Sequence, residues 1–265
     1  MPDSFDLFVF HRDPGFDAAC LEGGASGIVV DFETHGKAHR QAGFDTQING
    51  HDWQDLRDIK QQLQAYVICR INGINDHTES EVRQALALGA DEILIPMVRK
   101  LEEVTTILDF VKEEARVSVM IETMEAVAIT RQLDRLPLAR AYVGLNDLRI
   151  CRGSESIFTA MADGTLESIR EMIKSVPFGF GGLTLPGCGA PLPVECFLDE
   201  MTRLDCRFAF LRRAFFQATS GKNVRDELPR ISAAVRASLS RDQDSIKQGK
   251  RLLTEYLDRI LTTRQ

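Results

Sequence analysis

Acidic side chains follow several short apolar runs of this sequence. Glu122 closes the run VSVMIE, Asp147 closes RAYVGLND, and Asp31 and Glu33 close GIVVDFE. A charge is costly to bury unless an opposite charge or hydrogen bonds compensate it. Hard cations such as Mg²⁺ favour oxygen ligands and typically use one or two carboxylates. We therefore predict that Glu122 and Asp147 share one divalent ion. The alternative is that each carboxylate caps a helix or pairs with an arginine.

Basic side chains follow two further runs. Arg70 lies in ICRIN, and Arg212 lies in FAFLR. The planar guanidinium group matches the geometry of a carboxylate or a phosphate, so both arginines are candidates for binding an anionic substrate group. For Arg70 the alternative is a structural ion pair with Asp31 or Glu33. These two carboxylates share one face of their strand, because side chains alternate along a strand.

Eight apolar runs lie along the chain, and helical patterns fit between most of them. The runs cover residues 7–10, 27–32, 65–72, 92–97, 117–122, 140–147, 178–185 and 206–213. Several are rich in Val and Ile, as are parallel strands that are covered on both faces. The order predicts an α/β fold, a (β/α)₈ TIM barrel with additional C-terminal helices, whose chemistry gathers at the carboxyl ends of the strands. A doubly wound sheet is the alternative, which the missing GxGxxG spacing in LEGGASG disfavours.

The C-terminal part of the chain contains helical patterns but no further strand. We predict one barrel domain over residues 1–265, in which residues 222–263 form the C-terminal helices. The last of them, SIKQGKRLLTEYLDRIL, places Leu253, Tyr256 and Leu257 on one face. This face packs either on its own barrel or on a neighbouring subunit. The C-terminal helices are therefore candidates for oligomerisation.

Composition narrows the class of protein. The formal net charge of the 265 residues is -7, whereas non-specific nucleic-acid binding needs a basic face. No apolar segment approaches the ~20 residues that cross a membrane, and MPDSFDLFVFHRDP lacks the pattern of a signal peptide. The 6 cysteines form no CxxC pair, which indicates free thiols in a reduced compartment. We expect a cytoplasmic protein without nucleic-acid or membrane partners.

Five motifs resemble, in order, those of the HpcH/HpaI aldolase and citrate lyase β-subunit superfamily. They are GASGIVVDFE, ICRING, GADEILIPMVRKLEEV, MIETMEAV and YVGLNDL, between about residues 24 and 148. The resemblance implies a TIM barrel that is usually a homo-oligomer, such as a trimer or hexamer. It also implies that the chain binds Mg²⁺ or Mn²⁺ and makes or breaks C–C bonds next to a pyruvate or acyl-CoA enolate.

Carried over motif by motif, the resemblance assigns roles to residues of this chain. Glu122 and Asp147 would be the metal ligands. Arg70 would hold the keto oxygen or the carboxylate of the substrate. The substrate carboxylate would contact the turn formed by Gly144, Leu145 and Asn146.

One motif departs from the pattern of the pyruvate aldolases in the superfamily. They often carry D-x-E-H, whereas this chain reads Asp31-Phe32-Glu33-Thr34-His35, with the histidine displaced by one residue. Asp31, Glu33 and His35 are the candidate catalytic residues beside Arg70. An acidic pair in this region is instead typical of the CoA-ester lyases.

The predicted function is metal-dependent aldol or retro-aldol chemistry on a 2-oxo acid, through a metal-stabilised enolate. A 4-hydroxy-2-oxo acid would give pyruvate and an aldehyde, or the reverse. No lysine lies within the eight runs, which disfavours a Schiff-base aldolase. The alternatives are a CoA-ester lyase of the citrate or malyl-CoA type, with an acyl substrate, and a non-catalytic metabolite-binding barrel.

Overall fold

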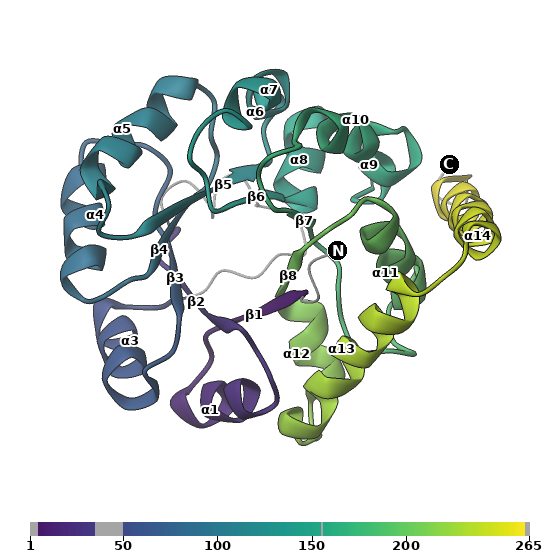
Figure 1. Ribbon diagram of the computed structural model, residues 1–265, viewed down its shortest axis with the longest axis horizontal. Coiled ribbons are helices and arrows are strands. Elements are labelled where there is room, and N and C mark those ends of the chain that lie inside the picture. Colours follow the sequence, from purple (N-terminus) through teal and green to yellow (C-terminus); the bar gives the residue numbers. More distant parts are fainter. Residues whose placement is uncertain (1–4, 35–49, 155, 263–265) are drawn as a thin grey trace.

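Eight parallel strands form the core of the computed structural model, which describes residues 5–34, 50–154 and 156–262. The strands are β1 (Asp6–Phe10), β2 (Gly27–Asp31), β3 (Val67–Arg70), β4 (Glu92–Ile95), β5 (Arg116–Ile121), β6 (Arg140–Val143), β7 (Phe178–Phe180) and β8 (Phe208–Leu211). Their order is β7-β6-β5-β4-β3-β2-β1-β8. The amide of Arg207 donates to the carbonyl of Phe178 at 2.9 Å, which brings β8 beside β7. The predicted TIM barrel is confirmed (Figure 1).

Helices surround the strands on the outside (Figure 1). They are α1 (Pro14–Glu22), α3 (Trp53–Asp58), the π-helix η1 (Ile59–Leu63), α4 (Thr78–Ala87), α5 (Leu101–Val111), α6 (Met124–Ala128), α7 (Thr130–Leu133), α8 (Leu145–Arg152), α9 (Thr159–Ala162), α10 (Thr165–Met172), α11 (Val194–Arg203), α12 (Arg213–Thr219), α13 (Val224–Leu239) and α14 (Gln243–Thr262). None of the helices that the structure describes is long and apolar enough to span a membrane.

Alternate residues of each strand point into the barrel, and the rest point toward the helices. The interior side chains form one buried cluster, which contains Phe8, Phe10, Val29, Ile68, Leu94, Met120, Tyr142, Phe208 and Phe210. The outward side chains join the larger core beneath the helices. The alternation continues past the strand ends. Asp31, Arg70 and Glu122 therefore follow Val29, Ile68 and Met120 on the interior face, toward the carboxyl end.

The strands end earlier than the apolar runs suggested. The run 140–147 was predicted as one strand, but β6 ends at Val143 and α8 begins at Leu145. Asp147 therefore lies in the first turn of α8, and its prediction as a strand terminus was wrong. Similarly, β8 ends at Leu211, and Arg212 is the residue that precedes α12. Each helix begins with residues that include a buried apolar side chain, Leu145 in α8 and Phe215 in α12, so the apolar pattern does not mark the end of the strand.

A buried ion pair fills the amino end of the barrel. Glu92 is fully buried and contacts the guanidinium group of Arg140. Its carboxylate also accepts hydrogen bonds from the hydroxyl of Tyr66 at 2.8 Å and from that of Ser118 at 2.5 Å. Arg140 lies over the ring of Phe8, at 4.5 Å from its centroid. The amino end is thereby filled by side chains, which leaves the carboxyl end for a ligand.

We expect Glu92→Ala to destabilise the protein by about 3–5 kcal/mol, because the Arg140 charge would stay buried without its partner. Urea unfolding followed by circular dichroism measures this change. The control is Glu79→Ala, which removes an exposed pair with Arg83 and should cost less than about 1 kcal/mol. Equal losses in the two variants would contradict the structural role of Glu92.

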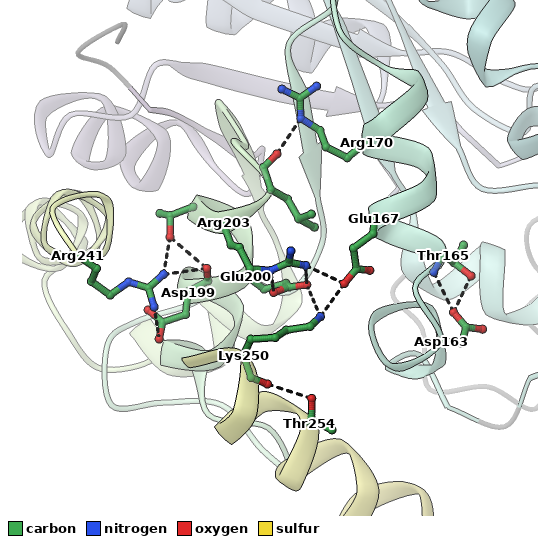
Figure 2. A network of polar contacts seen from close by, with 12 residues as sticks. Asp163, Thr165, Glu167, Arg170, Asp199, Glu200, Arg203, Arg241, Lys250 and Thr254 are labelled. Carbon is green, nitrogen blue, oxygen red and sulfur yellow. Dashed lines mark hydrogen bonds and ion pairs between the residues drawn. The ribbon is translucent and has the colours of Figure 1, made fainter. Parts of the chain in front are cut away.

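The C-terminal helix α14 packs on its own chain, beside α11 (Figure 1). Leu253 and Leu257 are buried, as the helical pattern predicted. Figure 2 shows the polar contacts beside them, in which the Lys250 ammonium group reaches Glu167 at 2.6 Å and Glu200 at 3.0 Å. This face therefore contacts the chain's own α11, and a role of the C-terminal helices in oligomerisation stays a prediction.

Candidate active site

A cavity of about 250 Å³ opens at the carboxyl end of the barrel. Seven of the residues singled out in the sequence line it together: Arg70, Glu122, Gly144, Leu145, Asn146, Asp147 and Arg212. They come from β3, from the residues that directly follow β5, β6 and β8, and from the first turn of α8. Polar groups from distant parts of the sequence therefore meet around one small space, beside the aromatic rings of the barrel interior.

Glu122 lies directly after β5 and is 1% exposed. One oxygen, Oε1, accepts a hydrogen bond from the amide of Met97 at 2.9 Å. The other, Oε2, lies against Gly144, where an added Cβ would come within 2.3 Å of it. A side chain at position 144 would displace the Glu122 carboxylate. The glycine is therefore required for the close approach of the two segments.

The Glu122 carboxylate is placed where its charge is disfavoured. Burial, together with the nearby Asp147 and Glu33 carboxylates, raises its pKa to about 8, while Arg70 and the Met97 amide act in the opposite direction. A carboxylate with such a pKa is protonated at neutral pH unless a cation compensates it. The electrostatics at Glu122 thus favour a positive ligand.

The donor set at this position fits a hard divalent cation. Glu122 and Asp147 are buried and offer carboxylate oxygens to the same cavity. Among the residues that the structure describes, no group of three or more His, Cys, Asp or Glu side chains is arranged to hold a metal ion. A pair of carboxylates does not fit a closed structural zinc site, which uses four protein ligands. It does fit Mg²⁺ or Mn²⁺ with one or two carboxylates and the remaining positions for water and substrate.

Arg70 forms the ion pair that was considered as its structural alternative. Its Nε and Nη2 donate to Asp31 Oδ1 and Oδ2 at 2.8 and 2.7 Å, and Nη1 lies 3.2 Å from Glu33 Oε2. Burial alone would lower the pKa of Arg70, but Asp31 and Glu33 outweigh it and raise the pKa. Arg70 still lines the cavity. The structural ion pair and a role in binding substrate are therefore compatible for Arg70, because Asp31 and Glu33 hold its guanidinium group at the edge of the cavity.

Asp31 and Glu33, predicted as catalytic, are buried next to Arg70. The Asp31 carboxylate contacts both cavity arginines, since Arg212 Nη2 lies 3.4 Å from Oδ2. In the described part of the chain, neither acid is among the residues that line the cavity. Their clearest role in the geometry is to position the arginines. His35 lies outside the described residues.

Arg212 is a second cation of the site. Its side chain is 27% exposed, and its guanidinium carbon lies 4.8 Å from the centroid of the Phe10 ring. Burial and the neighbouring Arg70 lower its pKa to about 10, so it remains charged at neutral pH. Arg212 and its neighbour Arg213 both line the cavity that Glu122 also lines.

Two histidines that the sequence reasoning missed lie behind the end of β2. His51 Nδ1 accepts a hydrogen bond from the amide of Asp31 at 2.8 Å. Its ring lies 5.0 Å from that of His11, whose Nδ1 lies 2.6 Å from Asp17 Oδ2. Burial lowers the pKa of His51 to about 4, which keeps it neutral as an acceptor. His11 follows the first apolar run as Glu122 follows the fifth, so the same pattern was available to find it.

We expect the metal-free protein to lose stability as the pH rises toward about 8. The folded-state pKa of Glu122 lies above its ordinary value, so folding retains a proton that the unfolded chain has lost. The stabilisation is complete below about pH 4.5 and decreases by at most about 1.4 kcal/mol per pH unit across this window.

Urea unfolding of wild type and Glu122→Gln in EDTA, at several pH values between about 5 and 8, measures this effect. Because His11 also has a raised pKa, only the difference between the two proteins reports on Glu122. Parallel pH profiles would contradict the prediction.

The sequence and the structure were compared with those of known proteins. No family model matches the sequence, and no curated protein matches it. Among solved structures, an HpcH/HpaI aldolase/citrate lyase family protein from Burkholderia cenocepacia J2315 matches with a TM-score of 0.61 and 11% identity, over 79% of this chain and 88% of that one. Citrate synthase SbnG matches with a TM-score of 0.61 and 16% identity, over 93% and 95%.

A citrate lyase from Burkholderia xenovorans LB400 matches with a TM-score of 0.60 and 14% identity, over 96% of this chain and 82% of that one. At such identities the likeness concerns the fold. The resemblance seen in the five sequence motifs is confirmed at that level. In its fold, the chain is similar to solved proteins of the HpcH/HpaI aldolase/citrate lyase family.

Proposed function

We propose that the chain is a divalent-metal-dependent aldolase, which cleaves a 4-hydroxy-2-oxo acid to pyruvate and an aldehyde or catalyses the reverse reaction. The observation that carries the proposal is the meeting of Glu122 and Asp147 with Arg70 and Arg212 around one cavity. The carboxylates suit Mg²⁺ or Mn²⁺, and the arginines suit the carboxylate of a 2-oxo acid. The likeness of the fold to an HpcH/HpaI aldolase/citrate lyase family protein supports the same chemistry.

The chain's own residues orient the substrate in this proposal. Arg70 is held rigidly by Asp31 and donates to the 2-oxo oxygen. The first turn of α8, at Leu145 and Asn146, presents backbone amides to the substrate carboxylate, because the first amides of a helix have no partner within it. Arg212, which contacts the same Asp31 carboxylate as Arg70, adds further positive charge to the cavity.

The bond changes balance without any oxidant or reductant. The C3–C4 bond breaks, the proton of the 4-hydroxyl group passes to a base, and the electron pair moves onto the pyruvate part. A proton then returns to C3 and completes the methyl group. When bound, the divalent ion would supply positive charge to the oxygen on which negative charge develops. His35, or a water molecule held by Glu33, is proposed as the base.

Release of pyruvate from 4-hydroxy-2-oxo acids, measured with lactate dehydrogenase and NADH, tests the proposal. We expect turnover with Mg²⁺ or Mn²⁺, loss of turnover in EDTA, and recovery when excess metal is added. Undiminished activity in EDTA would exclude the metal role.

A CoA-ester lyase remains the second candidate, since one matching structure is a citrate lyase. It predicts that acetyl-CoA, rather than pyruvate, raises the melting temperature in the presence of Mg²⁺. If neither ligand is turned over while the metal binds, a non-catalytic metabolite-binding barrel is favoured. We also propose that the chain forms a homo-oligomer, a trimer or hexamer, which light scattering coupled to size-exclusion chromatography measures.

A further inference from the structure

Among the described residues that line the cavity, the segment after β7 contributes no charged side chain. The charged side chains come from the ends of β3, β5 and β8, from α8 and from Arg213, the first residue of α12. Strand β7 lies next to β6 and is followed by Gly181, Gly182 and Leu183, which all line the cavity. The segment after β7 therefore contributes backbone and one apolar side chain where the neighbouring segments contribute charges.

Each of the two glycines lies against an aromatic residue of the cavity. Gly182 has a φ of +117°, and a Cβ added there would lie 2.3 Å from the ring of Phe197. The ring thus packs directly on the backbone at this position. A Cβ at Gly181 would lie 3.3 Å from the hydroxyl oxygen of Tyr142, another cavity residue. Both glycines keep this side of the cavity open.

Leu145, Ile157, Leu183 and Phe197 together form what we call the apolar wall of the cavity. They come from α8, from the connection after it, from the segment after β7 and from α11. Phe158 supports the wall from behind, with its ring centroid 6.0 Å from that of Phe197. None of these four side chains is charged. A charged group placed against them would lose hydration without gaining a partner from the four side chains.

We propose that the apolar wall binds the variable part of the substrate, and that the aldehyde released or accepted by the enzyme is uncharged and apolar. This inference rests on the proposed aldolase function. With the 2-oxo acid held by Arg70, beside the divalent ion that Glu122 and Asp147 would bind, the rest of the substrate extends toward the wall. Burial of one methylene group contributes about 0.8 kcal/mol, which corresponds to about fourfold in kcat/KM.

The aldol direction tests the inference with defined probes. Pyruvate and Mg²⁺ are combined with propanal, butanal or pentanal, and with succinic semialdehyde as an acidic aldehyde. We expect kcat/KM to rise about fourfold per methylene group until the cavity is filled. We expect butanal to exceed succinic semialdehyde, which has the same number of carbons, by about tenfold or more. A preference of the wild-type protein for succinic semialdehyde would overturn the inference.

A charge placed in the wall gives a second, independent measurement. Ile157 is only partly buried, so Ile157→Arg is compatible with folding, which thermal unfolding verifies. We expect this variant to shift the preference toward succinic semialdehyde by about tenfold. The matched control is Ile74→Arg, because Ile74 is 43% exposed and is not among the residues lining the cavity. An equal preference in both variants would contradict a role for the wall.

Exchange of the pyruvate methyl protons with deuterium from the solvent distinguishes failure of the apolar-aldehyde inference from failure of the proposed aldolase function. The exchange needs no aldehyde, so it reports on the proposed activation of pyruvate alone. Exchange together with a preference for the acidic aldehyde overturns the inference and leaves the aldolase function intact. Absence of exchange and of turnover with every aldehyde overturns both.

Discussion

Replacing Glu122 by Gln is expected to lower kcat of the proposed aldol cleavage by about 10²–10³-fold and to weaken Mg²⁺ binding, while the barrel still folds. Glutamine keeps the shape of the side chain, so the acceptor for the Met97 amide is retained. The negative charge that would hold the ion is lost. In EDTA above neutral pH, the variant is expected to be more stable than the wild type, because burial disfavours the Glu122 charge.

Isothermal titration with Mg²⁺ or Mn²⁺ and steady-state kinetics measure the two effects of this substitution. The control is Glu125→Gln, three residues along the chain at an exposed position, where the side chain pairs with Arg99. This variant should bind the metal as the wild type does. Unchanged metal affinity in Glu122→Gln would refute Glu122 as a ligand.

Replacing Arg70 by Met is expected to destabilise the protein by about 3–5 kcal/mol and to abolish turnover. The substitution leaves Asp31 and Glu33 buried without the guanidinium group that compensates them. Arg70→Lys should recover part of the stability but little activity, because one ammonium group cannot make the two parallel hydrogen bonds to Asp31.

A double-mutant cycle with Asp31→Asn isolates the contribution of the pair. If Asp31 positions Arg70, the Arg70→Met/Asp31→Asn protein should be more stable than the sum of the single changes predicts. As a control, Arg99→Met removes an exposed pair with Glu125 and should cost less than about 1 kcal/mol. Strictly additive losses in the cycle would contradict the proposed pairing.

The positions of the eight strands were predictable because each is a continuous apolar segment, covered on both faces. The ends of these strands were not predictable from the apolar pattern. After Val143 the chain turns at Gly144 and enters a helix at Leu145, and this apolar residue does not show that the backbone has already left the sheet. The turn depends on Gly144. A larger residue does not fit there, because the Glu122 carboxylate from a neighbouring strand occupies the space of its side chain. Such a long-range contact leaves no periodic signal.

The inward direction of the site residues was predictable from the alternation of side chains, because Asp31, Arg70 and Glu122 continue the interior face of their strands. Their pairing was left as two alternatives, since a sequence gives no distances between charges. The hydrogen bond from the Asp31 amide to the His51 side chain joins residues 20 positions apart, and His51 lies in neither a helix nor a strand. Neither its existence nor the neutral state of His51 follows from spacing.

The apolar wall was also not predictable from the sequence. Ile157, Leu183 and Phe197 come from three separate segments, and each alone is indistinguishable from an ordinary core residue. Phe197 reaches the cavity because Gly182 has no side chain. The C-terminal helix is the opposite case. Its apolar face, with Leu253 and Leu257, was visible as a helical repeat, and only the surface that covers it needed the structure.

The central claim is that a divalent ion at Glu122 and Asp147 activates a 2-oxo acid in this cavity. Deuterium exchange of the pyruvate methyl protons, followed by nuclear magnetic resonance in heavy water, tests it most directly. The account predicts exchange with Mg²⁺ or Mn²⁺, loss of exchange in EDTA, and recovery when excess metal is added. Exchange that continues at the same rate in EDTA would contradict it.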